Sequence, residues 1–287
     1  MSRLIPASAV LLSLVAAATT IGTPPARAQQ ARAQQAKSTP APQQAMRDYE
    51  YSFRISGSDD GHTTSGTMRV SGDRGRIYVD DSKDGGYMLL SDGGRTLTLV
   101  HPDRRAYEVT DAAAFERIVG TALKTVGPIV KIELQSAHVA SDHLGAGGTV
   151  AGRPTQRVRL TQDFTVRVGA LGFGGDAERH VVTTDYWVSP GLTLMRNPLF
   201  GLIEGGEAAL VQTDNAYLKV LARERDTLLE GATPLRRVVT SRDEKGTTKT
   251  QTIEITALRA TTPADARIFE LPAGYKRTEG VSWLTSR

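Results

Sequence analysis

The chain of 287 residues contains no cysteine. This absence excludes disulfides, zinc sites with thiolate ligands, cysteine nucleophiles and a lipid-modified N-terminal cysteine. The fold must therefore be held together without disulfides, by its hydrophobic core. Apolar residues make up 39% of the sequence, and its 28 glycines bring that share close to the globular norm, so a sizeable core is possible.

Catalytic and cofactor-binding motifs are also missing. The sequence has no H-E-x-x-H, G-x-S-x-G or G-x-x-x-x-G-K-[ST] pattern. The glycine-rich stretches at residues 145–148 and 172–175 do not lead from a buried strand into a helix, so they do not predict a dinucleotide site. We expect a protein that is not an enzyme and has no cofactor, with a hydrolase as a less favoured alternative.

Histidine and carboxylate spacings do not predict a metal site. His138 and His143 are five residues apart, which places them on different faces of a helix or a strand. The acidic pairs at residues 59–60 and 80–81 fall at hairpin ends, where solvated turn acids are the simpler interpretation. We therefore expect no bound metal.

The charge pattern argues against a nucleic-acid partner. The formal net charge is +4, and residues 1–28 contribute Arg3 and Arg27 without any acidic residue, so the remainder carries only +2. The densest basic pairs, at residues 104–105 and 236–237, are short and lie among 31 acidic residues. This is not the extended basic surface that nucleic-acid binding requires.

The first 28 residues are typical of a secretory signal. Arg3 precedes an apolar run at residues 9–18, and the A-R-A sequence at 26–28 is a signal-peptidase site. An uncleaved anchor is the alternative, but Pro6, Ser8 and Ser13 keep the run below the roughly 20 apolar residues of a membrane-spanning helix. We expect a periplasmic, non-lipidated protein with no transmembrane segment after cleavage.

Residues 29–45 consist mostly of alanine, glutamine and proline and contain no large apolar side chain. Such a segment cannot bury enough surface to fold, so it is predicted to be a disordered linker. Residues 46–287 then form a single β-rich domain.

The clearest structural signal is a β-meander at residues 66–109. Apolar residues alternate with polar ones in four short runs, which predict four strands. The turns at residues 72–75, 84–86 and 92–94 contain glycine where a hairpin needs a positive φ. A strand with alternating aromatic residues, at 49–55, precedes the meander and is expected to pair with it.

The rest of the chain predicts about ten strands in total and two helices. Helical periodicity appears at residues 111–126 and 207–229, with the charged residues 223–226 largely on the outer side of the longer helix. Further strands are predicted at 129–139, 150–160, around 164–168, at 180–188, and as a final hairpin of 235–241 with 248–258. Residues 145–148 and 169–175 are predicted to be loops.

Residues 189–203 are very apolar but have neither helical nor strand periodicity. Leaving so many large apolar side chains in water would be costly, at about 1.5–3 kcal/mol each. The segment is therefore expected to be a lid or docking loop beside a cavity, or else part of the core.

Several motifs together resemble uncharacterised exported proteins of the LolA/LolB-like, lipoprotein-carrier-like superfamily. They are the signal sequence, M-R-V-S-G-D-R-G-R-I-Y-V at 68–79, V-A-G-R-P-T-Q-R-V-R-L at 150–160, D-Y-W-V-S-P at 185–190 and I-F-E-L-P-A-G-Y at 268–275. The resemblance spans residues 49–275 and implies an α+β fold: an unclosed, strongly curved antiparallel sheet, or half-barrel, with about two helices covering or filling it. Characterised carriers of that superfamily hold acyl chains in an apolar cavity. Unlike LolB-type receptors, this chain has no cysteine to be lipidated.

These observations lead to a functional expectation. We expect a non-enzymatic periplasmic protein that binds a hydrophobic ligand, either a lipid or a lipoprotein acyl chain; the alternative is a protein–protein interaction module of the envelope, with an unknown partner. The expected ligand-binding residues are apolar side chains of the sheet and of the 189–203 segment: Phe53, Met68, Met88, Leu90, Leu97, Leu99, Trp187, Leu194, Met195 and Phe200.

Overall fold

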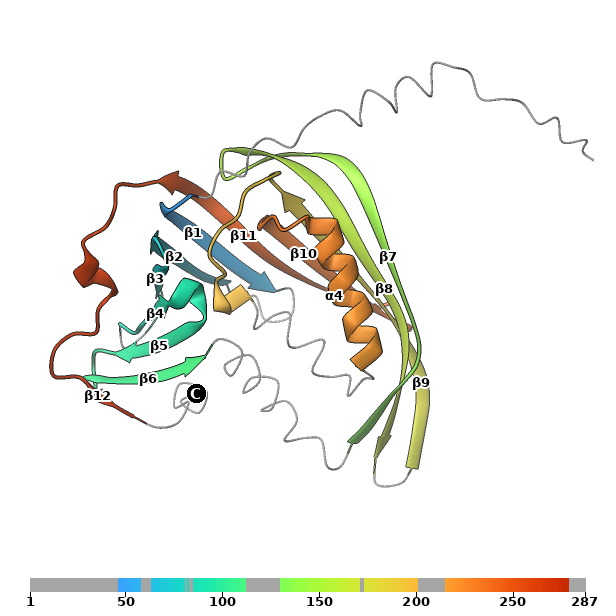
Figure 1. The fold of residues 1–287 in the computed structure, drawn as a ribbon. Helices are drawn as coiled ribbons and strands as arrows, with labels where there is room; N and C mark the ends of the chain where they lie inside the picture. Colours follow the sequence, from blue (N-terminus) through green and yellow to red (C-terminus); the bar gives the residue numbers. More distant parts are fainter. Residues whose placement is uncertain are drawn as a thin grey trace, which may run out of the picture. The chain divides into compact units, whose positions relative to one another are not determined.

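The computed structural model describes residues 46–57, 63–80, 82, 85–111, 130–170, 173–200 and 215–278. All of them belong to the second of two units, Ala41–Arg287. Their main structure is one sheet of 12 strands (Figure 1).

The sheet is mixed and does not close on itself. Its strand order is β12-β6-β5-β4-β3-β2-β1-β11-β10-β9-β8-β7, so β12 and β7 form the edges. All neighbours are antiparallel except β12 and β6. The strands are β1 (Asp48–Gly57), β2 (Thr63–Ser71), β3 (Arg74–Val79), β4 (Tyr87–Ser91), β5 (Thr96–His101), β6 (Ala106–Asp111), β7 (Val130–Val150), β8 (Arg153–Ala170), β9 (Phe173–Val188), β10 (Pro234–Asp243), β11 (Thr248–Ala260) and β12 (Lys276–Arg277).

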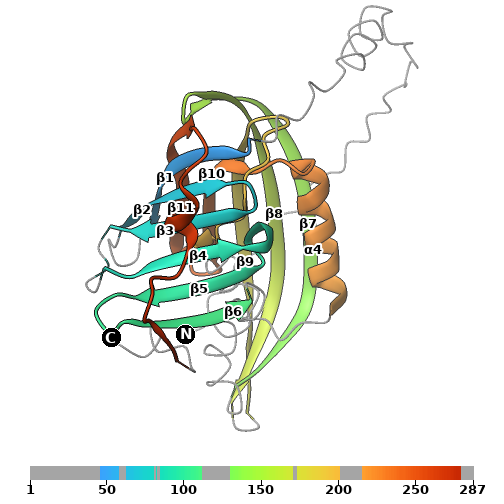
Figure 2. The same cartoon turned by 60° about the vertical axis from the view of Figure 1, so that its left-hand side comes forward.

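The described helical elements are few. They are the 3₁₀ turns η1 (Asp92–Gly94) and η2 (Ala266–Phe269), the α-helix α4 (Asn215–Leu229), and a helical turn at residues 198–200. Helix α4 packs on β7 and β8 (Figures 1 and 2), where Leu228 joins a buried cluster with Val158 and Leu160. Its bounds confirm the last 15 residues of the helix predicted at 207–229. The helix predicted at 111–126 lies outside the described residues, apart from Asp111, which ends β6.

The predicted fold class was wrong. The protein is a mainly β structure built on a large mixed sheet, not an α+β half-barrel filled by helices. One cause is the pair of glycine-rich stretches predicted to be loops. Residues 145–148 lie inside β7, where the register shifts near Gly145 and Gly148 absorb the extra residues, and most of 169–175 extends β8 and β9. Bulges of this kind allow glycine inside a strand.

The meander was predicted correctly except that it has one strand more. Strands β2 to β5 match the four predicted runs, and β6 adds a fifth. Alternation places one set of side chains on what we call the inner face, where Tyr51, Phe53 and Met68 are almost completely buried. As expected, β1 pairs with β2.

The residues that follow β9, numbers 189–200, run across the inner face, and we call them the crossing segment. Leu192, Leu194 and Leu199 belong to the same core cluster as the inner-face residues of β1 to β5. The crossing segment therefore covers apolar surface that the sheet would otherwise expose.

Residues 261–275, the C-terminal segment, cover the opposite, outer face of the meander before the chain enters β12 (Figure 2). Arg76 Nη1 donates a hydrogen bond of 2.8 Å to the carbonyl of Ile268, and the Arg76 guanidinium also lies 3.8 Å from the centre of the Tyr87 ring. Tyr275 packs against the outer-face cluster that contains Tyr87 and Leu89. With both faces covered, Leu89 and Leu90 are both buried although they point in opposite directions.

The outer face of β8 and β9 carries a buried carboxylate. Asp185 is 7% exposed and accepts hydrogen bonds from Arg157 and Arg159 of the neighbouring strand. Burial raises the pKa of Asp185, but the hydrogen bonds from Arg159 and Arg157 outweigh it and hold the pKa below its ordinary value.

The turn glycines give a first prediction. Gly94 has φ +90°, as expected, but Gly75 lies inside β3, and a Cβ there would come within 3.1 Å of Met195 Sδ and Met68 Cε. Gly94→Val should lose about 1–3 kcal/mol of unfolding free energy through backbone strain, and Gly75→Val should lose about 1–3 kcal/mol through overpacking. Urea denaturation measures both, with the exposed Thr63→Val as the control; a parental stability for Gly75→Val would show that β3 and the crossing segment do not pack this closely.

Asp185 gives a pH prediction. The pKa of Asp185 is lower in the folded state than in the unfolded state. Its contribution to the free energy of unfolding is therefore present above the unfolded pKa of about 4, and it is lost as the pH falls through the folded pKa. Asp185→Asn should cost about 1.5–3 kcal/mol near pH 7, and the difference from the parent should shrink in acid. Urea denaturation across this pH range tests it. The exposed pair of Asp163 with Arg179 supplies a control, since Asp163→Asn should have a smaller effect; equal effects would contradict the prediction.

Candidate functional site: a cavity under the crossing segment

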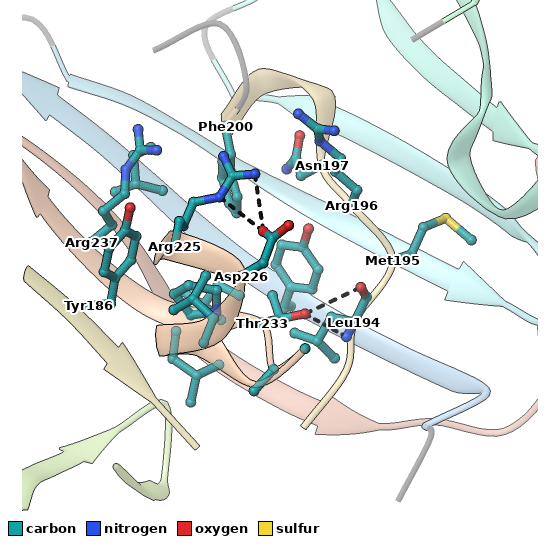
Figure 3. A pocket seen from close by; sticks show the side chains of 18 residues that line it. Tyr186, Leu194, Met195, Arg196, Asn197, Phe200, Arg225, Asp226, Thr233 and Arg237 are labelled. Atoms are coloured by element: carbon teal, nitrogen blue, oxygen red, sulfur yellow. Dashed lines mark hydrogen bonds and ion pairs between the residues drawn. The ribbon is translucent and has the colours of Figure 1, made fainter. Parts of the chain in front are cut away.

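A cavity of about 340 Å³ lies between the inner face of the sheet, the crossing segment and the end of α4 (Figure 3). Strands β1, β11, β10 and β9 provide its floor, with Tyr51, Ile255, Leu235 and Tyr186 among the side chains. The remaining walls come from residues 194–200, from the last turns of α4 and from residues 231–233. The volume lies near the lower end of the range for small-molecule sites, about 300–1,000 Å³.

The crossing segment forms the roof of the cavity and is attached to the loop that follows α4. The Leu194 backbone N–H donates to Thr233 Oγ1 at 2.9 Å, and the same hydroxyl lies 3.4 Å from the Leu194 carbonyl (Figure 3). The Thr233 backbone N–H donates to the Leu192 carbonyl at 2.8 Å. One threonine therefore satisfies backbone groups that an irregular apolar segment cannot pair by itself.

A second attachment comes from strand β1. The Met195 backbone N–H donates a hydrogen bond to the hydroxyl of Tyr49, a residue that is 1% exposed. Burial raises the pKa of Tyr49 to about 12, although the Met195 hydrogen bond acts in the opposite direction. Burial also raises the pKa of Tyr51, whose hydroxyl donates to Met68 Sδ at 2.8 Å. Both phenols therefore stay neutral at physiological pH and act as hydrogen-bonding groups.

Aromatic rings form one end of the cavity. The Phe200 ring lies 5.6 Å from the Phe53 ring in an edge-to-face arrangement and 6.5 Å from the Tyr51 ring. Such contacts contribute roughly 0.5–1.5 kcal/mol beyond the burial of area. Because Phe200 and Tyr51 also line the cavity, the same rings that hold the crossing segment on the sheet present apolar surface to the empty space.

Charged groups line the otherwise apolar walls. Arg225 and Asp226, at the end of α4, form an ion pair of 3.3 Å whose carboxylate is 72% exposed, and the chain places Arg196 on the crossing segment. Arg237 differs from them because it lies on the floor, on β10, and is only 6% exposed. The cavity can therefore accept an apolar group together with an acidic one.

Three of the ten expected ligand-binding residues line this cavity: Leu194, Met195 and Phe200. Six others lie under the crossing segment instead, where its leucines occupy the space expected for a ligand. They are Phe53, Met68, Leu90, Leu97 and Leu99, which are buried in the core, and Met88, which is partly buried against it.

Trp187 is not among the lining residues. Strand alternation puts it on the outer face, where its ring lies 5.0 Å from the Arg157 guanidinium and 4.9 Å from that of Arg236. Trp187 is partly buried and also packs against the core cluster that contains Leu192 and Leu194.

Sequence reasoning missed the floor and one wall of the cavity. Residues 223–226 were expected on the outer side of the helix, yet Arg225 and Asp226 line the cavity. A signal for Arg237 was present, since residues 235, 237 and 239 alternate on one strand face and the other two, Leu235 and Val239, are buried. An arginine in that position breaks the apolar pattern.

The described residues show neither a metal centre nor a membrane-spanning helix. The described part of the chain contains no group of three or more histidine, cysteine or acidic side chains arranged to hold a metal ion. Within the same residues, no helix combines the length and apolar character needed to cross a membrane.

Comparisons with known proteins assign no family. No family model matches the chain and no curated protein resembles it significantly. One solved structure with a detectable likeness is the crystal structure of an uncharacterized conserved protein from Thermus thermophilus, with a TM-score of 0.34 and 9% identity over 88% of this chain and 98% of that chain. A likeness this low carries no argument about fold or function.

The attachment of the roof gives the next prediction. Thr233→Val keeps the shape of the side chain but removes the acceptor of the Leu194 N–H, so it should cost about 1–3 kcal/mol of unfolding free energy. Thr193→Val is a matched control in the crossing segment, because Thr193 is exposed and its hydroxyl makes a long contact of 3.5 Å with the Gly231 carbonyl. Denaturant unfolding compares the two, and equal effects would show that Thr233 does not hold the segment.

Proposed function

We propose that this protein binds a hydrophobic ligand in the cavity under the crossing segment and does so without chemical conversion. The observation that carries the proposal is the cavity itself, whose walls are mostly apolar and whose floor belongs to the sheet. Sites for apolar small molecules have this composition, with a few polar groups that fix orientation. The resemblance of the sequence motifs to LolA/LolB-like carriers, which hold acyl chains, points in the same direction.

The cellular setting is part of the same proposal. The N-terminal sequence favours export to the periplasm with cleavage after Ala28. A lipid or the acyl part of a lipoprotein is the ligand class that such a compartment supplies. The cavity favours ligand binding over the alternative of a docking module, because the crossing segment already uses much of its apolar surface within the chain.

Filling the cavity should abolish binding. Ala232 lines it and is 8% exposed, so a phenyl group at this position occupies part of the 340 Å³. The neutral fluorescent probe N-phenyl-1-naphthylamine should bind the parent, and Ala232→Phe should weaken its binding by about tenfold or more, a difference of about 1.4 kcal/mol. Fluorescence titration measures the affinity, and thermal unfolding verifies that the variant is folded.

The matched control is Ala257→Phe, which adds the same group to an exposed position of β11 outside the cavity. It should bind the probe like the parent. A parent that never binds the probe would end the proposal. Binding that survives Ala232→Phe would move the site elsewhere.

A further inference from the structure

We infer that the ligand is an amphiphile with one alkyl chain and an acidic head group, and that Arg237 binds this head group from the floor of the cavity. The inference rests on the proposed function and specifies its ligand class. Figure 3 shows the side chain of Arg237 among the residues that surround the cavity.

The position of Arg237 is the first observation. It follows Leu235 and precedes Val239 on the inner face of β10, and both neighbours are buried. Its cross-strand neighbours are Tyr186 of β9 and Ile253 of β11. Placing a guanidinium among such side chains is expensive unless it meets good polar partners. On the floor of the cavity, this guanidinium offers donors that a purely apolar ligand would not use.

The charge of the walls is the second observation. The described lining residues carry three guanidinium groups, on Arg196, Arg225 and Arg237, and one carboxylate, on Asp226. A guanidinium has five N–H donors, so each arginine can bind a ligand oxygen while keeping a protein partner. Its planar fork fits carboxylate and phosphate oxygens in pairs. The walls therefore favour an acidic head group over a neutral or cationic one.

The size of the cavity is the third observation. At about 340 Å³ it is small for a ligand-binding site. A single alkyl chain suits this space better than the several chains of a complete lipid. The acidic group is a carboxylate if the ligand is a fatty acid and a phosphate if it is a lysophospholipid or related ester, and both share the chemistry that Arg237 recognises.

The test uses calorimetric titration of the purified protein with decanoate, decyl phosphate, decanol and decyltrimethylammonium. The two acids should bind the parent at least about tenfold more tightly than decanol, as expected for charge-assisted hydrogen bonds, and the cation should bind more weakly than decanol. The tighter acid identifies carboxylate or phosphate. Arg237→Gln should lower the affinity for both acids to that for decanol and leave the affinity for decanol unchanged.

The matched control is Arg236→Gln, one residue away on the same strand. Arg236 lies on the outer face over Trp187 and does not line the cavity, so this variant should keep the full preference for acids. Equal affinity of the parent for decanol and the acids, or a preference that survives Arg237→Gln, would overturn the inference while leaving the proposed function intact. Failure of all four compounds to bind would overturn both.

Two further tests cover the case in which Arg237→Gln does not fold, and the first uses the parent protein. Added salt screens the attraction between an acidic ligand and the charged walls of the cavity, where the Arg225 side chain is 37% exposed. The affinities for decanoate and decyl phosphate should therefore fall as the ionic strength rises, while the affinity for decanol should not. In the second test, Arg237→Lys should lower the affinity for both acids, because lysine keeps the charge but loses the planar fork of the guanidinium. Salt-independent binding of the acids would overturn the inference.

Discussion

The contact on which the rest of the structure depends is that of the crossing segment with the inner face of the sheet. A sheet face rich in Tyr51, Phe53 and their neighbours would be insoluble if exposed, and the described part of α4 packs on β7 and β8 instead of on the meander. An irregular segment can cover that face only if its backbone groups find partners. Thr233 and Tyr49 provide them, and the space left beside these attachments becomes the cavity.

Much of the fold could be predicted where local signals agree. In the meander, alternation and glycine indicate the same strands, and the structure contains these strands together with a positive φ at Gly72 and Gly94. The prediction failed at residues 145–148 because glycine composition was given more weight than strand pairing. In β7 the pairing with β8 continues past these glycines through bulges, and that pairing depends on contacts with residues that follow in the sequence. Local propensity does not contain this information.

The site was predicted less well than the fold, for a related reason. The apolar stretch at 189–203 was expected to be a lid, a docking loop or part of the core; within its described part, Leu192, Leu194 and Leu199 join the core cluster, and Leu194, Met195 and Phe200 line the cavity. The sheet residues expected beside it were apolar, but apolar character does not distinguish core from a ligand site. Only the path of the crossing segment decides that Met68 and Leu97 are packed by the chain itself.

The informative positions are those where composition and burial disagree. Arg236 and Arg237 are consecutive residues of the same type, and alternation gives them opposite environments. Arg236 is partly buried on the outer face, where its guanidinium lies 4.9 Å from the centre of the Trp187 ring. Arg237 takes a position that the pattern of Leu235 and Val239 reserves for an apolar side chain, where burying a charge is costly unless polar groups compensate it. For a protein without a recognisable motif, such a position identifies a candidate binding group better than the apolar residues around it.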